Sequence, residues 1–336
     1  MKVLYIATTA KKRNRLDGET VKCKLLEEYL QKQENINLKS VDTDNWKHHI
    51  LRLVFLIIIY FFWCDKVVIS SADRGANIIL NFFRKVNCKK EIYYFVIGGS
   101  LYNNITEKKW KVESYIRIKE IYVEAKSLKE NLNSIGITNV QVVNNFRLVK
   151  PFKNMYQKEI EIRFVFFGRI IKAKGIEEAI RLINRLNKDG YKCRLDIFGQ
   201  VSKEYLKEIS KLFTKKIQYK GEIKPDNKTE YEILSQYDIF ILPTEYPGEC
   251  LPGALIDSYI AGLAVVVSDW QYAREYVEDN KNGIIFKYKD YEDMFKKTKK
   301  MITANLIQEF KNKSLKLSKK YLIEENLKDF IKKILR

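Results

Sequence analysis

The sequence predicts an α/β protein built from two doubly wound, Rossmann-like domains that face a cleft. Strand-like segments alternate with helix-like segments, and this alternation runs twice, with a break near Pro151. A chain of 336 residues also exceeds what one hydrophobic core usually serves. Alternating strands and helices build parallel sheets with helices on both faces. Such sheets bind ligands at the carboxyl ends of their strands.

The first series occupies the N-terminal half. Apolar residues recur at helical spacing over Glu19–Gln33, which predicts a helix. A second helix is expected over Lys126–Ser134, closed by Gly136, because glycine readily adopts the left-handed conformation that ends many helices. The strands are expected at Lys2–Thr8, Lys66–Ser70, Glu91–Ile97, Ile121–Val123 and Val140–Val143.

The second series follows the break. Its strands are expected at Arg163–Phe167, Arg194–Phe198, Ile217–Tyr219, Ile239–Leu242 and Ala264–Val267. Its helices are expected at Ile176–Lys188, Lys203–Phe213, Thr229–Gln236 and Gly253–Ala261. We therefore expect an N-terminal domain over 1–150, a C-terminal domain over 151–318, and a final helix over 319–336 that could pack back on the first domain.

Composition excludes several classes of protein. The five cysteines are scattered and form no Cys-x-x-Cys pair, so a zinc site or disulfide scaffold is not expected, and a reducing, cytoplasmic setting fits best. The formal net charge of +20 suits nucleic acid, an anionic membrane or an anionic substrate, or reflects solvated lysines alone. No nucleic-acid-binding motif accompanies the charge, so we expect no nucleic-acid partner.

One apolar segment, Leu53–Cys64, leaves two interpretations open. It is shorter than the roughly 20 residues that span a bilayer. A core helix of the first domain is the favoured interpretation. The alternative is an interfacial helix, since Trp46 and Trp63 lie near its ends and basic residues precede it. An anionic membrane surface is then a further partner, and the protein would work at the inner face of the membrane.

The first motif that carries chemistry runs from Gly168 to Gly175, after a predicted buried strand and before a helix. Gly168 lets the chain turn. Arg169 and Lys174 then offer two cations beside a helix N-terminus, an arrangement that suits a pyrophosphate. The same cations would stabilise charge on a departing nucleotide diphosphate. The alternative is a solvated loop with ordinary basic residues.

The second motif is the loop and helix that follow the strand Ile239–Leu242. Pro252 suits a first helical turn, whose free amides would bind phosphate or sugar oxygens. Glu249 lies in the loop, where a carboxylate can accept hydrogen bonds from sugar hydroxyls, and Asp257 lies further along the helix. A capped helix with acidic residues near its dipole is the weaker alternative.

The stretch Arg163–Phe286 resembles the C-terminal domain of retaining GT-B glycosyltransferases of the family-4 type. Arg169, Lys174 and Gly175 match its Arg-x4-Lys-Gly signature, and Glu249 matches the first position of its Glu-x7-Glu signature. The second position is Asp257, one methylene shorter. In the N-terminal half, the segment Asp17–Lys22, with Gly18, resembles the family's loop that approaches the donor phosphates.

The resemblance implies a hexosyl transfer with retention of configuration and without an essential metal. The donor would be a UDP- or GDP-linked sugar, and the acceptor a glycan or a lipid-linked molecule in surface polysaccharide synthesis. Glu249 would hold the sugar hydroxyls, Asp257 the ribose, and Arg169 and Lys174 the leaving group. Backbone groups of Leu251, Pro252 and Gly253 would hold sugar and diphosphate.

Other functions stay open at this point. The chain could be a non-catalytic sugar-nucleotide-binding subunit, a membrane-surface scaffold, or another GT-B enzyme such as an epimerase or a phosphorylase. The pair Asp42 and Asp44 forms an Asp-x-Asp sequence, which binds a metal–nucleotide in a different transferase fold. It lies far from the donor motifs in sequence, so we interpret it as a solvated loop. His48 and His49 are assigned no catalytic role.

Overall fold

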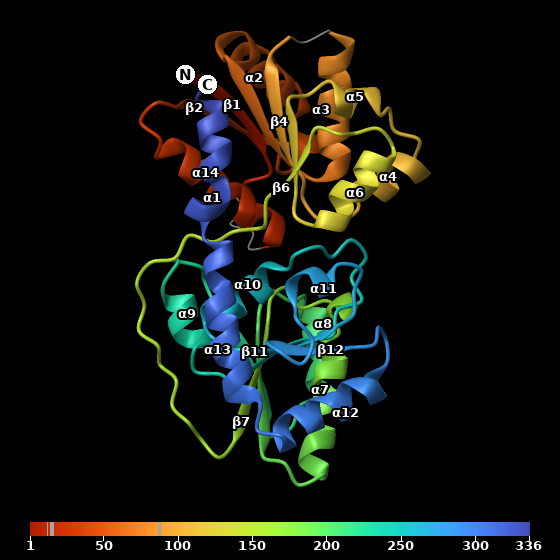
Figure 1. Ribbon diagram of the computed structural model, residues 1–336, viewed down its shortest axis with the longest axis vertical. Helices are drawn as coiled ribbons and strands as arrows, with labels where there is room; N and C mark the ends of the chain where they lie inside the picture. The colour runs from red at the N-terminus through yellow and green to blue at the C-terminus, as the bar shows by residue number, and fades with distance from the viewer. Residues whose placement is uncertain (12, 14–16, 87–88) are drawn as a thin grey trace. The chain divides into compact units, whose positions relative to one another are not determined.

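The computed structural model describes residues 1–11, 13, 17–86 and 89–336, which form two compact units. The first unit comprises 1–146 and 323–336, and the second comprises 147–322. Each contains a six-stranded sheet whose neighbouring strands all pair in parallel (Figure 1). The predicted architecture of two doubly wound α/β sheets is therefore confirmed.

The sheet of the first unit has the strand order β2-β1-β3-β4-β5-β6. Its strands are β1 (Lys2–Ala7), β2 (Asn37–Asp42), β3 (Lys66–Ser70), β4 (Glu91–Phe95), β5 (Glu120–Val123) and β6 (Val140–Val142). Its helices are α1 (Gly18–Gln31), α2 (Ile50–Trp63), α3 (Asp73–Lys85), α4 (Leu101–Glu107), α5 (Glu113–Ile116), α6 (Lys126–Ser134) and α14 (Ile323–Ile334), with the short turn η1 (Trp46–His48) before α2.

The sheet of the second unit has the strand order β12-β11-β10-β7-β8-β9. Its strands are β7 (Ile162–Phe167), β8 (Cys193–Phe198), β9 (Ile217–Gly221), β10 (Ile239–Leu242), β11 (Ala264–Ser268) and β12 (Gly283–Phe286). Its helices are α7 (Ile176–Lys188), α8 (Lys203–Ile209), α9 (Thr229–Leu234), α10 (Gly253–Ile260), α11 (Ala273–Tyr276), α12 (Tyr291–Thr303) and α13 (Ile307–Ser318); the 3-10 turns are η2 (Lys172–Lys174), η3 (Ser210–Leu212) and η4 (Lys319–Tyr321).

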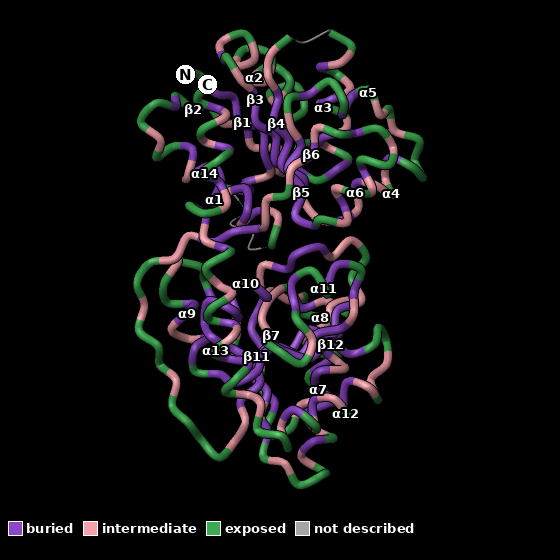
Figure 2. Tube along the Cα trace, viewed as in Figure 1, coloured by how far each residue is buried: buried purple, intermediate pink, exposed green. Residues whose placement is uncertain are grey.

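The central strands form the core of each unit. Every residue of β10 and of β11 is buried, and the strands run purple through both units in Figure 2. These strands are continuous apolar runs because helices cover both faces of a parallel sheet. The edge strand β2 differs, since its exposed and half-buried residues alternate over most of its length. That weak pattern explains why the sequence did not predict β2.

The helix α14 belongs to the first unit, although it follows the second unit in sequence. Phe330 packs among three aromatic rings of the sheet, with ring centroids 5.6 Å from Tyr93, 4.9 Å from Phe95 and 5.4 Å from Tyr122. The Lys333 ammonium group also donates to the Glu120 carboxylate. One helix therefore completes the core of a sheet that ends about 180 residues earlier in the chain.

The favoured interpretation of the apolar segment as a core helix is wrong. The segment forms α2, and none of its 14 residues is buried. Its inner side is half-buried and contacts β1 and β2, while its outer side faces solvent. An unbroken apolar run has no polar face, so the sequence did not reveal which side the sheet would cover. Across the described residues, no helix combines the length and the apolar character needed to cross a bilayer.

Candidate active site

The carboxyl edge of the second sheet is shaped by two glycines in close contact. Gly168 follows β7 with φ +135°, and Gly199 follows β8 with φ +145°. A Cβ atom on Gly199 would lie 1.6 Å from the Gly168 carbonyl oxygen. Only glycine fits this approach, and both backbone conformations are ones that other residues rarely adopt. The tight packing fixes the path of the backbone as it leaves β7, and hence the position of the Arg169 backbone.

A third glycine brings the first motif against the second. Gly175 has φ +76°, and a Cβ atom there would lie 2.1 Å from the carbonyl oxygen of Pro243. Nearby, the amide of Glu245 donates to the carbonyl of Ala173 at 2.7 Å. The turn η2 is therefore held against the loop that follows β10. This contact explains the glycine after Lys174 in the signature.

Lys174 and Glu249 meet at this edge, although they lie 75 residues apart in sequence. The Lys174 ammonium group donates to Oε2 of Glu249, and both side chains are largely buried. The hydroxyl of Thr244 donates to the same oxygen at 3.2 Å. Both donors bond Oε2, and no described residue donates to Oε1 of Glu249, so that oxygen can accept from another partner. The carboxylate is thus oriented by the protein, as a group that recognises hydroxyls needs to be.

Tyr246 joins the two cations of the first motif. Its ring centroid lies 5.4 Å from the guanidinium carbon of Arg169 and 5.1 Å from Nζ of Lys174, distances at which cations are attracted to an aromatic face. Arg169 is exposed and makes no ion pair within the part of the chain that the structure describes. Its charge is therefore not neutralised by a protein carboxylate and is available to an anion.

The start of α10 is held rigidly beside these groups. Pro252 precedes the helix, and the side chains of Cys250 and Leu251 are buried. The indole of Trp270 donates to the carbonyl of Cys250 at 3.0 Å. The first-turn amides of Gly253 and its neighbour cannot bond within the helix, so they can donate to a ligand.

Asp257 has a partner that the sequence did not predict. Arg147 donates from Nε to Oδ1 at 2.7 Å and from Nη2 to Oδ2 at 3.2 Å, and both side chains are buried. The hydroxyl of Tyr231 lies 3.4 Å from Oδ1. A Cβ atom on Gly253 would lie 2.0 Å from Nη2 of Arg147, so the guanidinium packs directly against the first turn of α10. The ribose contact expected of Asp257 stays a prediction. A ribose would have to share the carboxylate with Arg147 and Tyr231.

Gly18 and the Asp-x-Asp sequence lie in the first unit. Gly18 is the first residue of α1, with no atom within 4 Å of a Cβ built on it. Asp42 accepts hydrogen bonds from the amides of Thr9, Ala10 and Lys11, so it organises the loop after β1 rather than facing solvent alone. Among the described residues, no three His, Cys, Asp or Glu side chains are grouped closely enough to hold a metal ion.

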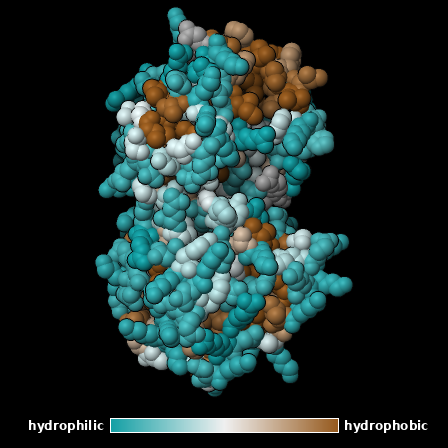
Figure 3. All heavy atoms as spheres, turned by 90° about the vertical axis from the view of Figure 1, so that its right-hand side faces the viewer, coloured by the Kyte–Doolittle hydropathy of each residue, from teal (hydrophilic) through white to brown (hydrophobic). Residues whose placement is uncertain are grey.

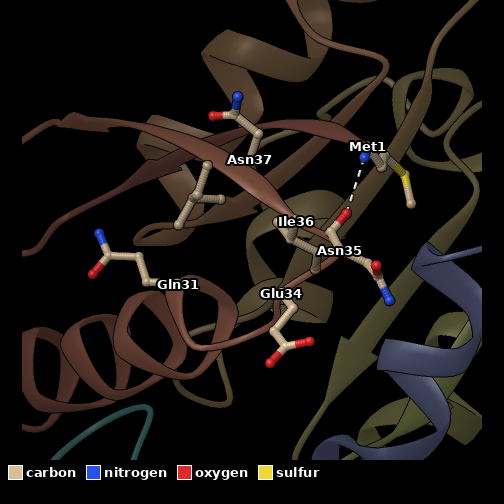
Figure 4. Close-up of a pocket in the computed structure, with 7 residues that line it drawn as sticks. Met1, Gln31, Glu34, Asn35, Ile36 and Asn37 are labelled. Carbon is tan, nitrogen blue, oxygen red and sulfur yellow. Dashed lines mark hydrogen bonds between the residues drawn. The ribbon is translucent and has the colours of Figure 1, made fainter.

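An open depression also lies at the amino end of β2 (Figure 4). Glu34, Asn35 and Asn37 line it, and the amino group of Met1 donates to the carbonyl of Asn35 at 2.9 Å. Parallel sheets bind ligands at the carboxyl ends of their strands, which is the opposite edge. We therefore assign no site there.

A model of the family described as "Glycosyl transferases group 1" matches residues 152–321, half of the chain. The chain belongs to this family. The matched region includes Arg169, Lys174, Glu249 and Asp257, and it coincides closely with the second compact unit. The resemblance inferred from the two signatures is therefore confirmed at the level of the family.

Two curated relatives are similar over most of this chain. An uncharacterized glycosyltransferase of Methanocaldococcus jannaschii is 27% identical over 259 residues, covering 74% of this chain and 56% of its own. The poly(ribitol-phosphate) alpha-N-acetylglucosaminyltransferase of Staphylococcus aureus is 23% identical over 288 residues, covering 80% and 57%. The chain thus spans little more than half the length of these relatives.

Among solved structures, the Anabaena protein HepE in complex with UDP-glucose has the same fold. The TM-score is 0.74 at 12% identity, and the match covers 99% of both chains. At that identity the likeness concerns the fold alone. It extends over both units, whereas the family model covers the second unit only.

Arg169, Lys174 and Glu249 were predicted from the sequence, and the structure brings these three together around Tyr246. Tyr246, Thr244 and Arg147 were given no role there. Tyr246 and Thr244 stand inside the predicted loop, so their position was a usable signal. The sequence did not show that Arg147 would be buried against Asp257, because a charged residue near a domain boundary is usually solvated.

Proposed function

We propose that the chain is a retaining glycosyltransferase that moves a hexose from a UDP-linked donor to a glycan or lipid-linked acceptor in surface polysaccharide synthesis. Arg169, Lys174 and Glu249 carry this proposal, because they converge at the carboxyl edge of β7 and β10 in a member of the family. A UDP donor is preferred over GDP because HepE, which shares the fold, binds UDP-glucose. The second unit would bind the donor and the first the acceptor.

The division of labour follows from the contacts. Arg169, with no acidic partner among the described residues, would bind the diphosphate and stabilise its charge as the sugar bond breaks. Lys174 would share that charge while holding Glu249 in place. The free oxygen of Glu249 would accept from a sugar hydroxyl, and the first-turn amides of α10 would donate to the phosphates. Leu251 and Pro252 would shape the backbone around the sugar.

Ligand binding tests the donor. UDP should raise the melting temperature more than GDP at equal concentration, because the ligand with the lower Kd stabilises the protein more. A ligand present at a hundred times its Kd stabilises a protein by about 2.7 kcal/mol. Turnover is then followed as release of UDP from UDP-sugars, with and without oligosaccharide acceptors. Stabilisation by GDP alone would reverse the choice of base. No stabilisation by any nucleotide would contradict the donor site itself.

The Arg169→Ala variant tests the site. Loss of a charge-assisted contact to the diphosphate should lower kcat/KM by about 2 kcal/mol, roughly 30-fold. Lys172→Ala is the matched control, because Lys172 is exposed and lies in the same turn as Lys174. Equal kinetics for Arg169→Ala, Lys174→Ala and the control would refute the assignment.

A further inference from the structure

An apolar surface on the first unit is left uncovered. It consists of outward side chains from two helices, and we refer to it as the α2–α3 face. Its members are Leu51, Val54, Phe55, Ile58, Ile59 and Phe62 of α2 with Ile78, Phe82 and Val86 at α3. Leu51 is 85% exposed and Phe62 is 79% exposed. Brown spheres gather over the upper right of the first unit in Figure 3.

The two helices form one continuous surface rather than separate patches. Phe61 of α2 stacks on Phe83 of α3 with ring centroids 5.2 Å apart. Phe62 and Phe82 flank this stack, each 5.8 Å from one of its rings. Monomeric soluble proteins rarely expose an apolar patch of this extent, and one that is present marks an interaction surface.

The charged residues within the two helix segments that form the face are all basic. Residues 45–63 and 74–86 contain no Asp or Glu. Lys47 and Arg52 are exposed at the start of α2. At its other end, Lys90 lies 5.0 Å from the Phe61 ring and Lys2 lies 5.8 Å from the Trp63 ring. The apolar face therefore has a basic rim at both ends of α2.

We propose that the α2–α3 face docks on an anionic lipid bilayer, with α2 lying in the plane of the interface. Its apolar side chains would enter the boundary between headgroups and acyl chains, and the rim lysines and arginine would pair with lipid phosphates. Trp46 and Trp63, near the two ends of the helix, suit the headgroup level. This inference concerns binding alone and does not depend on the proposed transfer reaction.

A second copy of the chain fits the face less well. A symmetric contact through α2 would bring the exposed Lys47 and Arg52 of one copy close to cations of the other, with no acidic residue of either helix segment to offset them. Like charges brought together oppose association. An anionic bilayer satisfies both the apolar centre and the basic rim.

Vesicle binding tests the proposal directly. The full chain should co-sediment with phosphatidylglycerol vesicles at least tenfold better than with phosphatidylcholine vesicles at low salt, and high salt should release it. Leu51→Gln with Phe62→Gln should weaken that binding at least tenfold. Ile160→Gln is the matched control, because Ile160 is also 85% exposed but lies in the second unit.

The basic rim has its own test. Lys47→Glu with Arg52→Glu should weaken binding to phosphatidylglycerol at least tenfold, whereas Lys203→Glu with Lys207→Glu, a matched pair on α8, should have little effect. All the substituted residues are exposed, and melting temperatures check that each variant folds. Equal binding to both vesicle types, or to neither, would overturn the proposal. So would a lipid-free dimer, seen by light scattering, that Leu51→Gln with Phe62→Gln dissociates.

Discussion

Arg147 and Asp257 form a buried, bidentate ion pair that joins the first residue of the second unit to the helix α10. The same guanidinium packs against Gly253, at the start of that helix. Asp257 occupies the second position of the family's two-carboxylate signature. In this chain it anchors α10 through its pair with Arg147, whatever else it binds.

Breaking this ion pair should destabilise the protein strongly. Arg147→Met leaves a buried carboxylate unpaired, which costs about 3–5 kcal/mol of unfolding free energy. The double variant Arg147→Met with Asp257→Asn should recover part of that loss, because no buried charge remains. Denaturant unfolding measures both. Lys313→Ala, which breaks the exposed pair with Glu309, is the control and should change stability by less than about 1 kcal/mol. A loss in the double variant equal to the sum of the single losses would contradict the pairing.

Glu249 should matter more for turnover than Asp257. Its hydrogen bonds to the sugar should strengthen as positive charge develops on the ring, so Glu249→Gln should lower kcat about 100-fold with little change in KM. Asp257→Asn should act mainly on KM, since a ribose contact does not change during the reaction. Because this change also breaks the buried pair with Arg147, the variant is assayed well below its own melting temperature.

The control for this experiment is Glu245→Gln. Glu245 lies in the same loop, but its carboxylate accepts from Tyr291 and pairs with Lys289, away from the two cations. Its replacement should leave kcat within about threefold of the parent. If Asp257→Asn abolishes kcat while Glu249→Gln is mild, the two roles are reversed.

Transfer should not require a divalent metal. Arg169 and Lys174 supply the positive charge that a metal ion would otherwise bring to the diphosphate. We expect the rate of UDP release to be unchanged in EDTA and not raised by added manganese. Loss of turnover in EDTA with recovery in manganese would return attention to Asp42 and Asp44, which would then have to exchange their present hydrogen bonds for metal.

Stability should rise with pH above about 8 because of Lys311. Burial lowers the pKa of this ammonium group to about 8, although Asp238 lies 3.9 Å away and opposes the shift. Between pH 8 and 10.5 the unfolded chain holds a proton that the folded chain has lost, so unfolding becomes less favourable as pH rises.

The matching variant is Lys311→Met. The stability of the parent relative to this variant should increase by about 2 kcal/mol between pH 7 and 9.5. Denaturant unfolding of both proteins at the two pH values gives the difference between their free energies of unfolding. The contributions of groups that titrate equally in both proteins cancel in this difference. A difference that is constant with pH would show that Lys311 keeps an ordinary pKa.

Much of the fold was predictable because local patterns were strong. The helix α6 and the strands β3 and β10 have the predicted bounds, since each is an uninterrupted periodic or apolar segment between polar residues. The helix α3 was given no prediction, although its buried residues recur at helical spacing.

The site was predictable only where residue type and spacing carried the chemistry. Arg169, Lys174 and Glu249 fall into signatures that fix their order along the chain. Tyr246 and Arg147 act through tertiary contacts, and a sequence does not show which charged side chain will be buried. The exposure of α2 was hidden for a similar reason, because its apolar run is compatible with either a covered or an uncovered helix.

The position of Phe330 has a consequence for synthesis on the ribosome. The aromatic rings of Tyr93, Phe95 and Tyr122 emerge about 200 residues before the ring that covers them. At ~5–20 residues per second, that interval lasts about 10–40 s. During it, the nascent first domain displays an uncapped aromatic surface as well as the apolar side of α2. A chaperone that shields apolar surface, or early contact with a membrane, would protect the chain at that stage more than after its release.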